Sequence, residues 1–120
     1  MKIYLAHSTK YDYQTELYKP IKESSLNQKH KFIFFMDEIS KGGVKSSKET
    51  IRNSDMLIAE ISKKSTGVGI ELGWADIFQI PIICIYKKGS KPSKHLKILT
   101  KDFIEYTNSK DLIENLKKLL

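Results

Sequence analysis

Several residue types that define whole classes of protein are scarce in this chain of 120 residues. There is one cysteine, Cys84, so no internal disulfide can form, which fits a reducing cytoplasm. Cys84 itself lies in an apolar run and is expected to be a small core residue. Histidine and cysteine do not cluster at the spacing of metal ligands, so no metal site is expected. No apolar run approaches membrane-spanning length, and Met1–Ala6 is too short for a signal peptide. We therefore expect a cytoplasmic protein without a membrane segment.

Positive charge, in contrast, is abundant, with a formal net charge of +7. The lysines are spread along the chain, and only Lys87–Lys97 is dense, with five lysines and His95. No aromatic-interleaved basic motif, zinc-finger signature or helix-turn-helix signature accompanies them, so a nucleic-acid polymer is not the expected partner. A solvated lysine-rich surface is the simpler interpretation, and a basic rim would also attract a small anionic substrate.

The apolar residues fall into five short runs separated by longer amphipathic stretches. The expected strands are Ile3–Ala6, Phe32–Met36, Met56–Ala59, Ile82–Tyr86 and Phe103–Tyr106. The expected helices lie near Tyr13–Leu26, Ser47–Ser54, Val68–Phe78 and Ser109–Leu120, with a short one near Ser93–Leu99. This alternation predicts right-handed crossovers and a parallel sheet covered on both faces. We expect residues 1–120 to form one domain, a flavodoxin-like three-layer α/β/α sandwich with five parallel strands.

Local signals refine the boundaries of these elements. Ser109 is expected to cap the last helix, and Ser46 or Ser47 the helix near residue 47. Pro81 is expected to open the fourth strand, where a missing N–H is tolerated. The segment Lys41–Lys45, with two glycines, is expected to be a flexible loop after the second strand.

The segment from Asp55 to Asp76 carries the strongest functional signal. It has the pattern of a buried strand, a polar stretch with glycines, and a helix whose first turn carries Glu71. Functional sites of open α/β sheets form at the carboxyl ends of the strands. Near a helix N-terminus, unpaired N–H groups and the helix dipole would favour an ionised Glu71 carboxylate, which can act as a nucleophile. The alternative is an ordinary capping carboxylate.

Glycines 67, 69 and 73 do not fit a dinucleotide fingerprint. The interval from Gly69 to Gly73 is one residue too long for G-x-G-x-x-G, and the motif follows the third strand instead of the first. We therefore expect no nicotinamide cofactor. The glycines instead indicate a tight turn and a close approach of the backbone to substrate.

The residues Ala59-Glu60, Ser65 and Gly67-x-Gly69-x-Glu71-Leu-Gly73 resemble the nucleoside 2-deoxyribosyltransferase superfamily. The closest branch is that of the small 2′-deoxynucleoside 5′-monophosphate N-hydrolases. The resemblance implies that Glu71 is the catalytic nucleophile, that Ser65 lines the sugar–phosphate pocket and that no cofactor is needed. Glu60, at the end of the third strand, could bind loop N–H groups or the sugar.

The resemblance extends to the end of the first strand, where Tyr4, Ser8 and Lys10 align with the family's aromatic, serine and arginine positions. It implies that this loop binds the 5′-phosphate. Lysine binds phosphate as a point charge, without the bidentate geometry of arginine. A solvated polar loop is the alternative interpretation.

The family's upstream aspartate has no direct counterpart in this chain. The matching position is Ser47, and Glu49 or the pair Asp37-Glu38 could substitute for it. In the family hydrolases, a serine from the loop after the fourth strand contacts the phosphate bound by the partner subunit. The resemblance therefore implies a homodimer in which Ser93, or else Ser90, reaches the neighbouring site.

Three functions are open on this evidence. The first is cleavage of the N-glycosidic bond of 2′-deoxynucleoside 5′-monophosphates by Glu71, which releases the free base and deoxyribose 5-phosphate. The second is transfer of deoxyribose between bases, favoured if Ser8 and Lys10 do not bind phosphate. The third is a non-catalytic nucleotide-binding or signalling module, because the fold alone does not fix the function.

Overall fold

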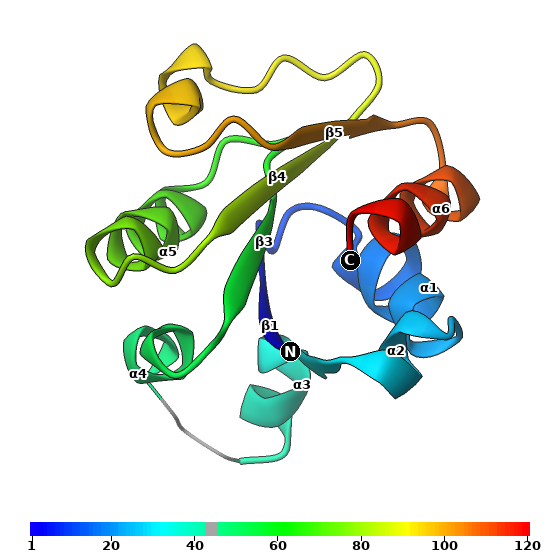
Figure 1. The fold of residues 1–120 in the computed structure, drawn as a ribbon, viewed down its shortest axis with the longest axis horizontal. Helices are drawn as coiled ribbons and strands as arrows, with labels where there is room; N and C mark the ends of the chain where they lie inside the picture. Colours follow the sequence, from blue (N-terminus) through cyan, green and yellow to red (C-terminus); the bar gives the residue numbers. More distant parts are fainter. Residues whose placement is uncertain (43–45) are drawn as a thin grey trace.

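The computed structural model describes residues 1–42 and 46–120 (Figure 1), so residues 43–45 of the expected glycine loop lie outside the described part. Five strands pair in parallel in the order β2-β1-β3-β4-β5. The strands are β1 (Lys2–His7), β2 (Lys31–Ile33), β3 (Met56–Glu60), β4 (Ile82–Lys87) and β5 (Phe103–Tyr106). The parallel five-stranded sheet expected from the apolar runs is confirmed.

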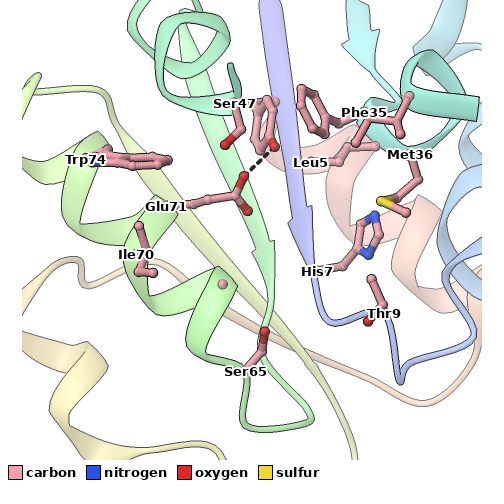
Figure 2. A pocket seen from close by; sticks show the side chains of 13 residues that line it. Leu5, His7, Thr9, Phe35, Met36, Ser47, Ser65, Ile70, Glu71 and Trp74 are labelled. Carbon is pink, nitrogen blue, oxygen red and sulfur yellow. Dashed lines mark hydrogen bonds between the residues drawn. The ribbon is translucent and has the colours of Figure 1, made fainter. Parts of the chain in front are cut away.

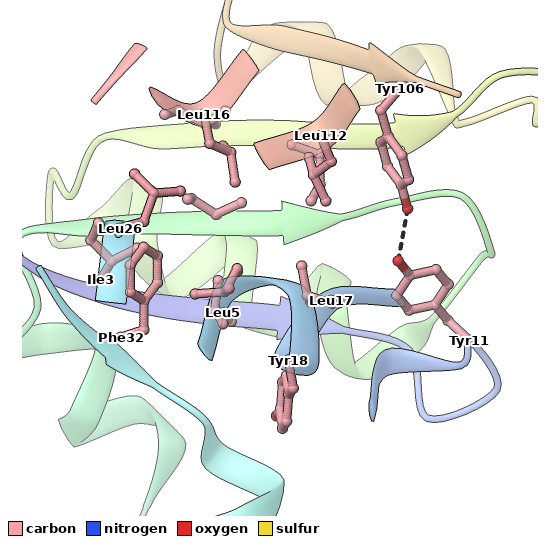
Figure 3. Packing of buried hydrophobic residues seen from close by; sticks show 14 residues of the cluster. Ile3, Leu5, Tyr11, Leu17, Tyr18, Leu26, Phe32, Tyr106, Leu112 and Leu116 are labelled. Carbon is pink, nitrogen blue, oxygen red and sulfur yellow. Dashed lines mark hydrogen bonds between the residues drawn. The ribbon is translucent and has the colours of Figure 1, made fainter. Parts of the chain in front are cut away.

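Helices cover both faces of the sheet, which gives three layers (Figure 1). The helical elements are η1 (Gln14–Tyr18), α1 (Lys19–Lys22), α2 (Leu26–Lys29), α3 (Phe35–Ser40), α4 (Ser47–Arg52), α5 (Thr66–Ile77), η2 (Lys94–Ile98) and α6 (Ser109–Leu119). Successive strand residues point to opposite faces. Ile3 and Leu5 therefore pack with η1, α1, α2 and α6 (Figure 3), whereas Tyr4 and Ala6 pack with α4 and α5.

The first expected helix, Tyr13–Leu26, is interrupted. A π-helical turn, η1, leads directly into the short helix α1, and a separate turn forms α2. Pro20 explains the irregularity because it has no N–H to donate to the carbonyl oxygen of Glu16, four residues earlier. The hydroxyl of Ser109 donates to that carbonyl at 3.4 Å. Asn108, instead of the expected Ser109, caps α6 by accepting from the amide of Asp111.

The second strand is shorter than expected. The apolar run Phe32–Met36 predicted a strand throughout, but β2 ends at Ile33 and a new helix, α3, begins at Phe35. A short apolar run does not distinguish strand from helix by periodicity. Because β2 is an edge strand paired with β1 over only three residues, the chain is free to turn there.

Cys84 is fully buried in the core, as expected, and burial raises the pKa of its thiol to about 11. Pro81 directly precedes β4, and its carbonyl accepts from the amide of Leu57 at 2.9 Å. Ser46 is the N-cap residue of α4, although its side chain makes no capping hydrogen bond. None of the helices in the described residues is long and apolar enough to span a membrane.

Candidate active site

A cavity of about 410 Å³ opens at the carboxyl end of β1, where the strand order reverses between β1 and β3. Ligands of open α/β sheets bind at such switch points. Figure 2 shows side chains from β1, α3, α4 and α5 converging on this pocket. The structure brings four predicted site residues together here, namely Tyr4, Ser65, Gly67 and Glu71.

Glu71 enters the pocket from the second turn of α5, not from the first turn as expected. It is the sixth residue of the helix, and no acidic residue lies in the first turn. Ser65 is the N-cap, and its hydroxyl oxygen accepts from the amide of Val68 at 3.3 Å. Since helix-dipole effects fade within the first turn, the helix N-terminus does not hold the Glu71 carboxylate in its ionised form.

A hydrogen bond from β1 holds this carboxylate instead. The phenol of Tyr4 donates to Oε2 of Glu71 (Figure 2). Burial raises the pKa of Glu71, and hydrogen bonds from Tyr4 and Ser47 counteract part of that rise. Burial and the adjacent carboxylate raise the pKa of Tyr4, so its phenol remains a proton donor. The site therefore contains a carboxylate that is harder to ionise than usual and is oriented by a neutral hydroxyl group.

His7 lines the same pocket, but both of its ring nitrogens are engaged. Nδ1 lies 3.2 Å from the carbonyl oxygen of Ser8, so this nitrogen carries the proton. Nε2 lies 2.7 Å from the hydroxyl of Tyr18 and accepts from it. Burial lowers the pKa of His7, and its ring stacks on Tyr13 with the centroids 4.4 Å apart. These contacts indicate a wall residue, and not a group that exchanges protons.

The glycines adopt a different conformation from the expected tight turn. Gly67 and Gly69 belong to α5, and neither has a positive φ angle. A methyl group at Gly67 would meet only the hydroxyl oxygen of Ser65, at 3.8 Å. Gly67 therefore leaves open space at the pocket wall, which suits a close approach of substrate to the backbone.

The predicted phosphate residues of the first loop do not line this cavity. Ser8 is buried, and its hydroxyl oxygen accepts from the amide of Lys10 at 3.0 Å. Lys10 is exposed, and Thr9, between the two, is the loop residue in the pocket wall. Ser8 thus shapes the loop, and Lys10 lies at its solvent side.

Glu60, Gly69 and Ser93 also lie outside the pocket. Glu60 points to the opposite face of the sheet, where it accepts hydrogen bonds from Ser62 and Tyr106. Gly69 and Ser93 line a separate hollow of about 220 Å³ beside the start of α5. Of the two roles expected for Glu60, the hydrogen bond from a loop N–H group is present, from Ser62, whereas the alternation of strand residues turns its side chain away from the face on which Glu71 lies.

None of the three acidic candidates for the missing upstream aspartate, Asp37, Glu38 and Glu49, lines the pocket. Asp37 pairs with Lys22 at 2.5 Å, which lowers the pKa of Asp37, and Glu49 pairs with Arg52 at 3.5 Å. Ser47, the position that matches the family's aspartate, does line the pocket. A neutral hydroxyl therefore occupies the place expected for a second carboxylate.

The apolar walls were not foreseen as part of the site. They are formed by Phe35, Met36, Ile39, Ile70 and Trp74. Trp74 lies three residues after Glu71, which places both on one side of α5 and is a signal that the sequence contained. Phe35 and Met36 belong to the apolar run that predicts a strand, so the sequence does not place them in the site. These side chains offer flat and apolar surfaces to a ring-shaped ligand.

No group of three or more histidine, cysteine, aspartate or glutamate side chains in the described residues could hold a metal ion. The polar side-chain groups of the pocket are hydroxyls, one imidazole, the indole N–H of Trp74 and one carboxylate. This set fits a small organic ligand with a polar sugar and a flat ring.

Comparisons with known proteins bear on both the fold and the motif. No protein-family model matches the chain. Over 41 residues it is 44% identical to a protein of Syntrophotalea carbinolica provisionally named 2′-deoxynucleoside 5′-phosphate N-hydrolase 1. The match covers 34% of this chain and only 29% of that relative. The resemblance to the deoxynucleotide N-hydrolases is confirmed.

Two solved structures share the complete fold. The first is the CMP N-glycosidase BcmB of Clostridium botulinum, with a TM-score of 0.71, 22% identity and 100% of both chains covered. The second is a conserved protein of Enterococcus faecalis V583, with a TM-score of 0.67, 21% identity, and 100% of this chain and 99% of that chain covered. At this level of identity the similarity establishes the flavodoxin-like fold.

Proposed function

We propose that this protein cleaves the N-glycosidic bond of 2′-deoxynucleoside 5′-monophosphates and releases the free base and deoxyribose 5-phosphate. The observation that carries the proposal is the Glu71 carboxylate, held by Tyr4 inside a cavity at the switch point of the sheet. The partial relative named as a deoxynucleotide N-hydrolase and the fold shared with a CMP N-glycosidase support it.

In the first step, a carboxylate oxygen of Glu71 bonds to C1′ while the bond from C1′ to the base nitrogen breaks. The electron pair of the broken bond stays on the base, which takes up a proton. Tyr4 binds Oε2, so Oε1 is the oxygen that we assign to the attack. The transition state resembles an oxocarbenium ion, as in retaining glycosidases.

In the second step, water bonds to C1′ and the glycosyl ester breaks, which regenerates the Glu71 carboxylate and releases one proton. Tyr4 keeps the carboxylate in one orientation throughout both steps. The ring of the base would lie against the apolar wall of Phe35 and Trp74, and the sugar near Ser65 and Gly67. An incoming base in place of water would make the protein a deoxyribosyltransferase, which is the alternative activity.

We also propose a homodimer, because α5 presents apolar side chains to solvent. Ile77 is 77% exposed and Ile70 is 50% exposed, on the helix that carries Glu71. Ile70 and Trp74 both belong to the pocket wall, so this helix face is continuous with the site. A second copy can cover such a face with an identical one. We propose in addition that Ser93 of each subunit contacts the phosphate bound at the site of the other subunit.

The test is incubation with a panel of deoxynucleosides, deoxynucleotides and ribonucleotides, with and without a free acceptor base. Release of free base from monophosphates without an acceptor, abolished by Glu71→Gln, is the expected result. Turnover only with an acceptor base would indicate the transferase. Base release that persists in Glu71→Gln would show that Glu71 is not the nucleophile.

A further inference from the structure

A second carboxylate, Glu60, is buried behind the pocket, on the face of the sheet opposite Glu71. It ends β3 and is only 1% exposed. Its oxygens accept three hydrogen bonds, from the amide of Ser62 at 2.6 Å, from the hydroxyl of Ser62 at 3.1 Å and from the phenol of Tyr106. A buried carboxylate is costly unless donors surround it, and this one is well supplied.

The hydrogen-bonded chain continues from Glu60 toward the first loop. Because Tyr106 gives its proton to Glu60, its oxygen accepts from the phenol of Tyr11 at 2.7 Å (Figure 3). Both tyrosines are buried, at 3% exposed for Tyr11 and 1% for Tyr106. The direction of the two hydroxyl groups is therefore set by the carboxylate at the end of the chain.

Tyr11 belongs to the loop that connects β1 to η1 and forms part of the pocket wall. Within this loop, the amide of Tyr13 donates to the carbonyl of Tyr11 at 2.7 Å, and the amide of Lys10 donates to the hydroxyl of Ser8. Thr9, two residues before Tyr11, lines the pocket. Fixing the side chain of Tyr11 therefore fixes the backbone that presents Thr9 and Lys10.

Lys87 ties the same network to the end of β4. Its amide donates to the hydroxyl of Ser62 at 2.7 Å, and its ammonium group pairs with Glu16 of η1 at 2.6 Å. The ends of β3, β4 and β5 are thus joined to the loop and to η1. Loops are usually the most mobile parts of a domain, so hydrogen bonds and an ion pair of this kind are needed to hold a binding loop in one conformation.

We infer that Glu60 and Tyr106 are positioning residues that, through Tyr11, hold the β1 loop in its ligand-binding shape. The inference rests on the proposed function for the identity of the ligand, a 5′-monophosphate. It also explains why a carboxylate occupies this position. A glutamine would bring two N–H donors to a place where Ser62 and Tyr106 already donate.

The test removes single hydroxyl groups, with Tyr11→Phe and Tyr106→Phe, in protein that also carries Glu71→Gln to prevent turnover. Calorimetry measures binding of deoxycytidine 5′-monophosphate and of deoxycytidine. One neutral hydrogen bond corresponds to an affinity change of about three- to tenfold. We expect a loss of this size for the monophosphate and a smaller loss for the nucleoside. The control Tyr86→Phe, a half-buried tyrosine that packs against the other core cluster, should bind like the parent.

Amide hydrogen exchange tests the same inference without a ligand. The Tyr13 amide should exchange about threefold faster or more in Tyr11→Phe and Tyr106→Phe, as expected for the loss of one neutral hydrogen bond, with no such change in Tyr86→Phe. Unchanged exchange in both variants would overturn the inference, as would equal affinity losses for the two ligands. If wild-type protein releases no base from any substrate, the proposed function fails, while exchange still decides whether the loop is anchored.

Discussion

The phenol of Tyr4 donates a hydrogen bond to the carboxylate of Glu71, 67 positions later in the chain. This contact joins the first strand to the second turn of α5 across the switch point of the sheet. It gives the carboxylate an orientation, and it opposes the effect of burial on the pKa of Glu71. Burial and the hydrogen bond from Tyr4 therefore have opposite effects on the pKa of the proposed nucleophile, and a substitution of Tyr4 removes the second effect.

Tyr4→Phe should move the acidic limb of the pH–rate profile to higher pH. Glu71 must be ionised to attack, so activity falls as the pH drops through the pKa of Glu71. Loss of the phenol removes a hydrogen bond that lowers this pKa, so the carboxylate becomes neutral at a higher pH. The measurement is kcat/KM for a deoxynucleoside monophosphate across the acidic range, with Tyr86→Phe as the control. An acidic limb that stays in place, or moves to lower pH, would contradict this assignment.

Glu71→Gln should stabilise the fold at neutral pH while it abolishes cleavage, with a loss of roughly 10³-fold or more. The pKa of Glu71 is raised above its ordinary value of 4.5 by burial. Below the pKa that Glu71 has in the unfolded chain, the neutral group contributes its full stability to the fold. This contribution is lost as the pH rises through the higher pKa that Glu71 has in the folded protein. The variant should therefore unfold at higher urea concentration than wild type near neutral pH, and the difference should shrink at about pH 4. A difference that does not depend on pH would contradict the linkage.

The sequence predicted the sheet, its five strands and the helix that carries Glu71. Strand–helix alternation and short apolar runs are local patterns, and both survive in the fold. The end of β2 could not be predicted, because the periodicity of the run Phe32–Met36 is compatible with either a strand or a helix, and only the pairing of β2 with β1 shows where the strand ends. Pro20, which interrupts the first helix, is visible in the sequence, whereas the hydrogen bond from Ser109 to the carbonyl oxygen of Glu16 joins residues far apart in the chain and could not be predicted.

For the site, the motif identified Glu71, Ser65 and Gly67, which the structure gathers around one pocket with Tyr4. It could not show on which face of the sheet the pocket lies, and so could not show that Glu60, a paired residue of β3, points away from it. Helical spacing places Trp74 beside Glu71, but the sequence could not bring Phe35 of α3 into the same pocket, since α3 and α5 are far apart in the chain. The roles of these residues remain proposals.

Lys10→Ala should weaken binding of 5′-monophosphates by about tenfold or more, since a charge-assisted contact contributes roughly 1.5–3 kcal/mol. Unphosphorylated nucleosides should lose much less affinity. Lys10 is exposed and adjoins Thr9 of the pocket wall, a position from which a flexible ammonium group can reach a phosphate. Calorimetry in the Glu71→Gln protein measures both ligands, with Lys29→Ala at the end of α2 as the control. Equal losses for both ligands would exclude Lys10 from phosphate binding and favour the transferase.

Ser65→Ala should destabilise the protein by about 1 kcal/mol, because the side chain of Ser65 caps α5 by accepting from the amide of Val68. Ser46→Ala is a matched control, since Ser46 is also an N-cap residue but makes no side-chain capping bond. The control should change the free energy of unfolding by only about a few tenths of a kcal/mol, as ordinary surface substitutions do. Urea unfolding measures both variants. Equal destabilisation of the two would show that the hydroxyl of Ser65 does not act as a cap.

Ile77→Glu should convert the proposed homodimer to a monomer. Ile77 is 77% exposed at the end of α5, the helix whose apolar side chains also line the pocket, so a second copy packed on this face would bury it. In the dimer, a carboxylate at this position would lose its hydration and lie close to the same carboxylate of the second copy. This costs roughly several kcal/mol of association free energy, as for a buried unpaired charge. Sedimentation at micromolar concentration measures the state of wild type and variant. Leu119→Glu, on α6 at the opposite face of the sheet, is the control and should leave the dimer intact. A wild-type monomer with full activity would disprove the dimer, and dissociation by Leu119→Glu alone would assign the interface to α6 instead.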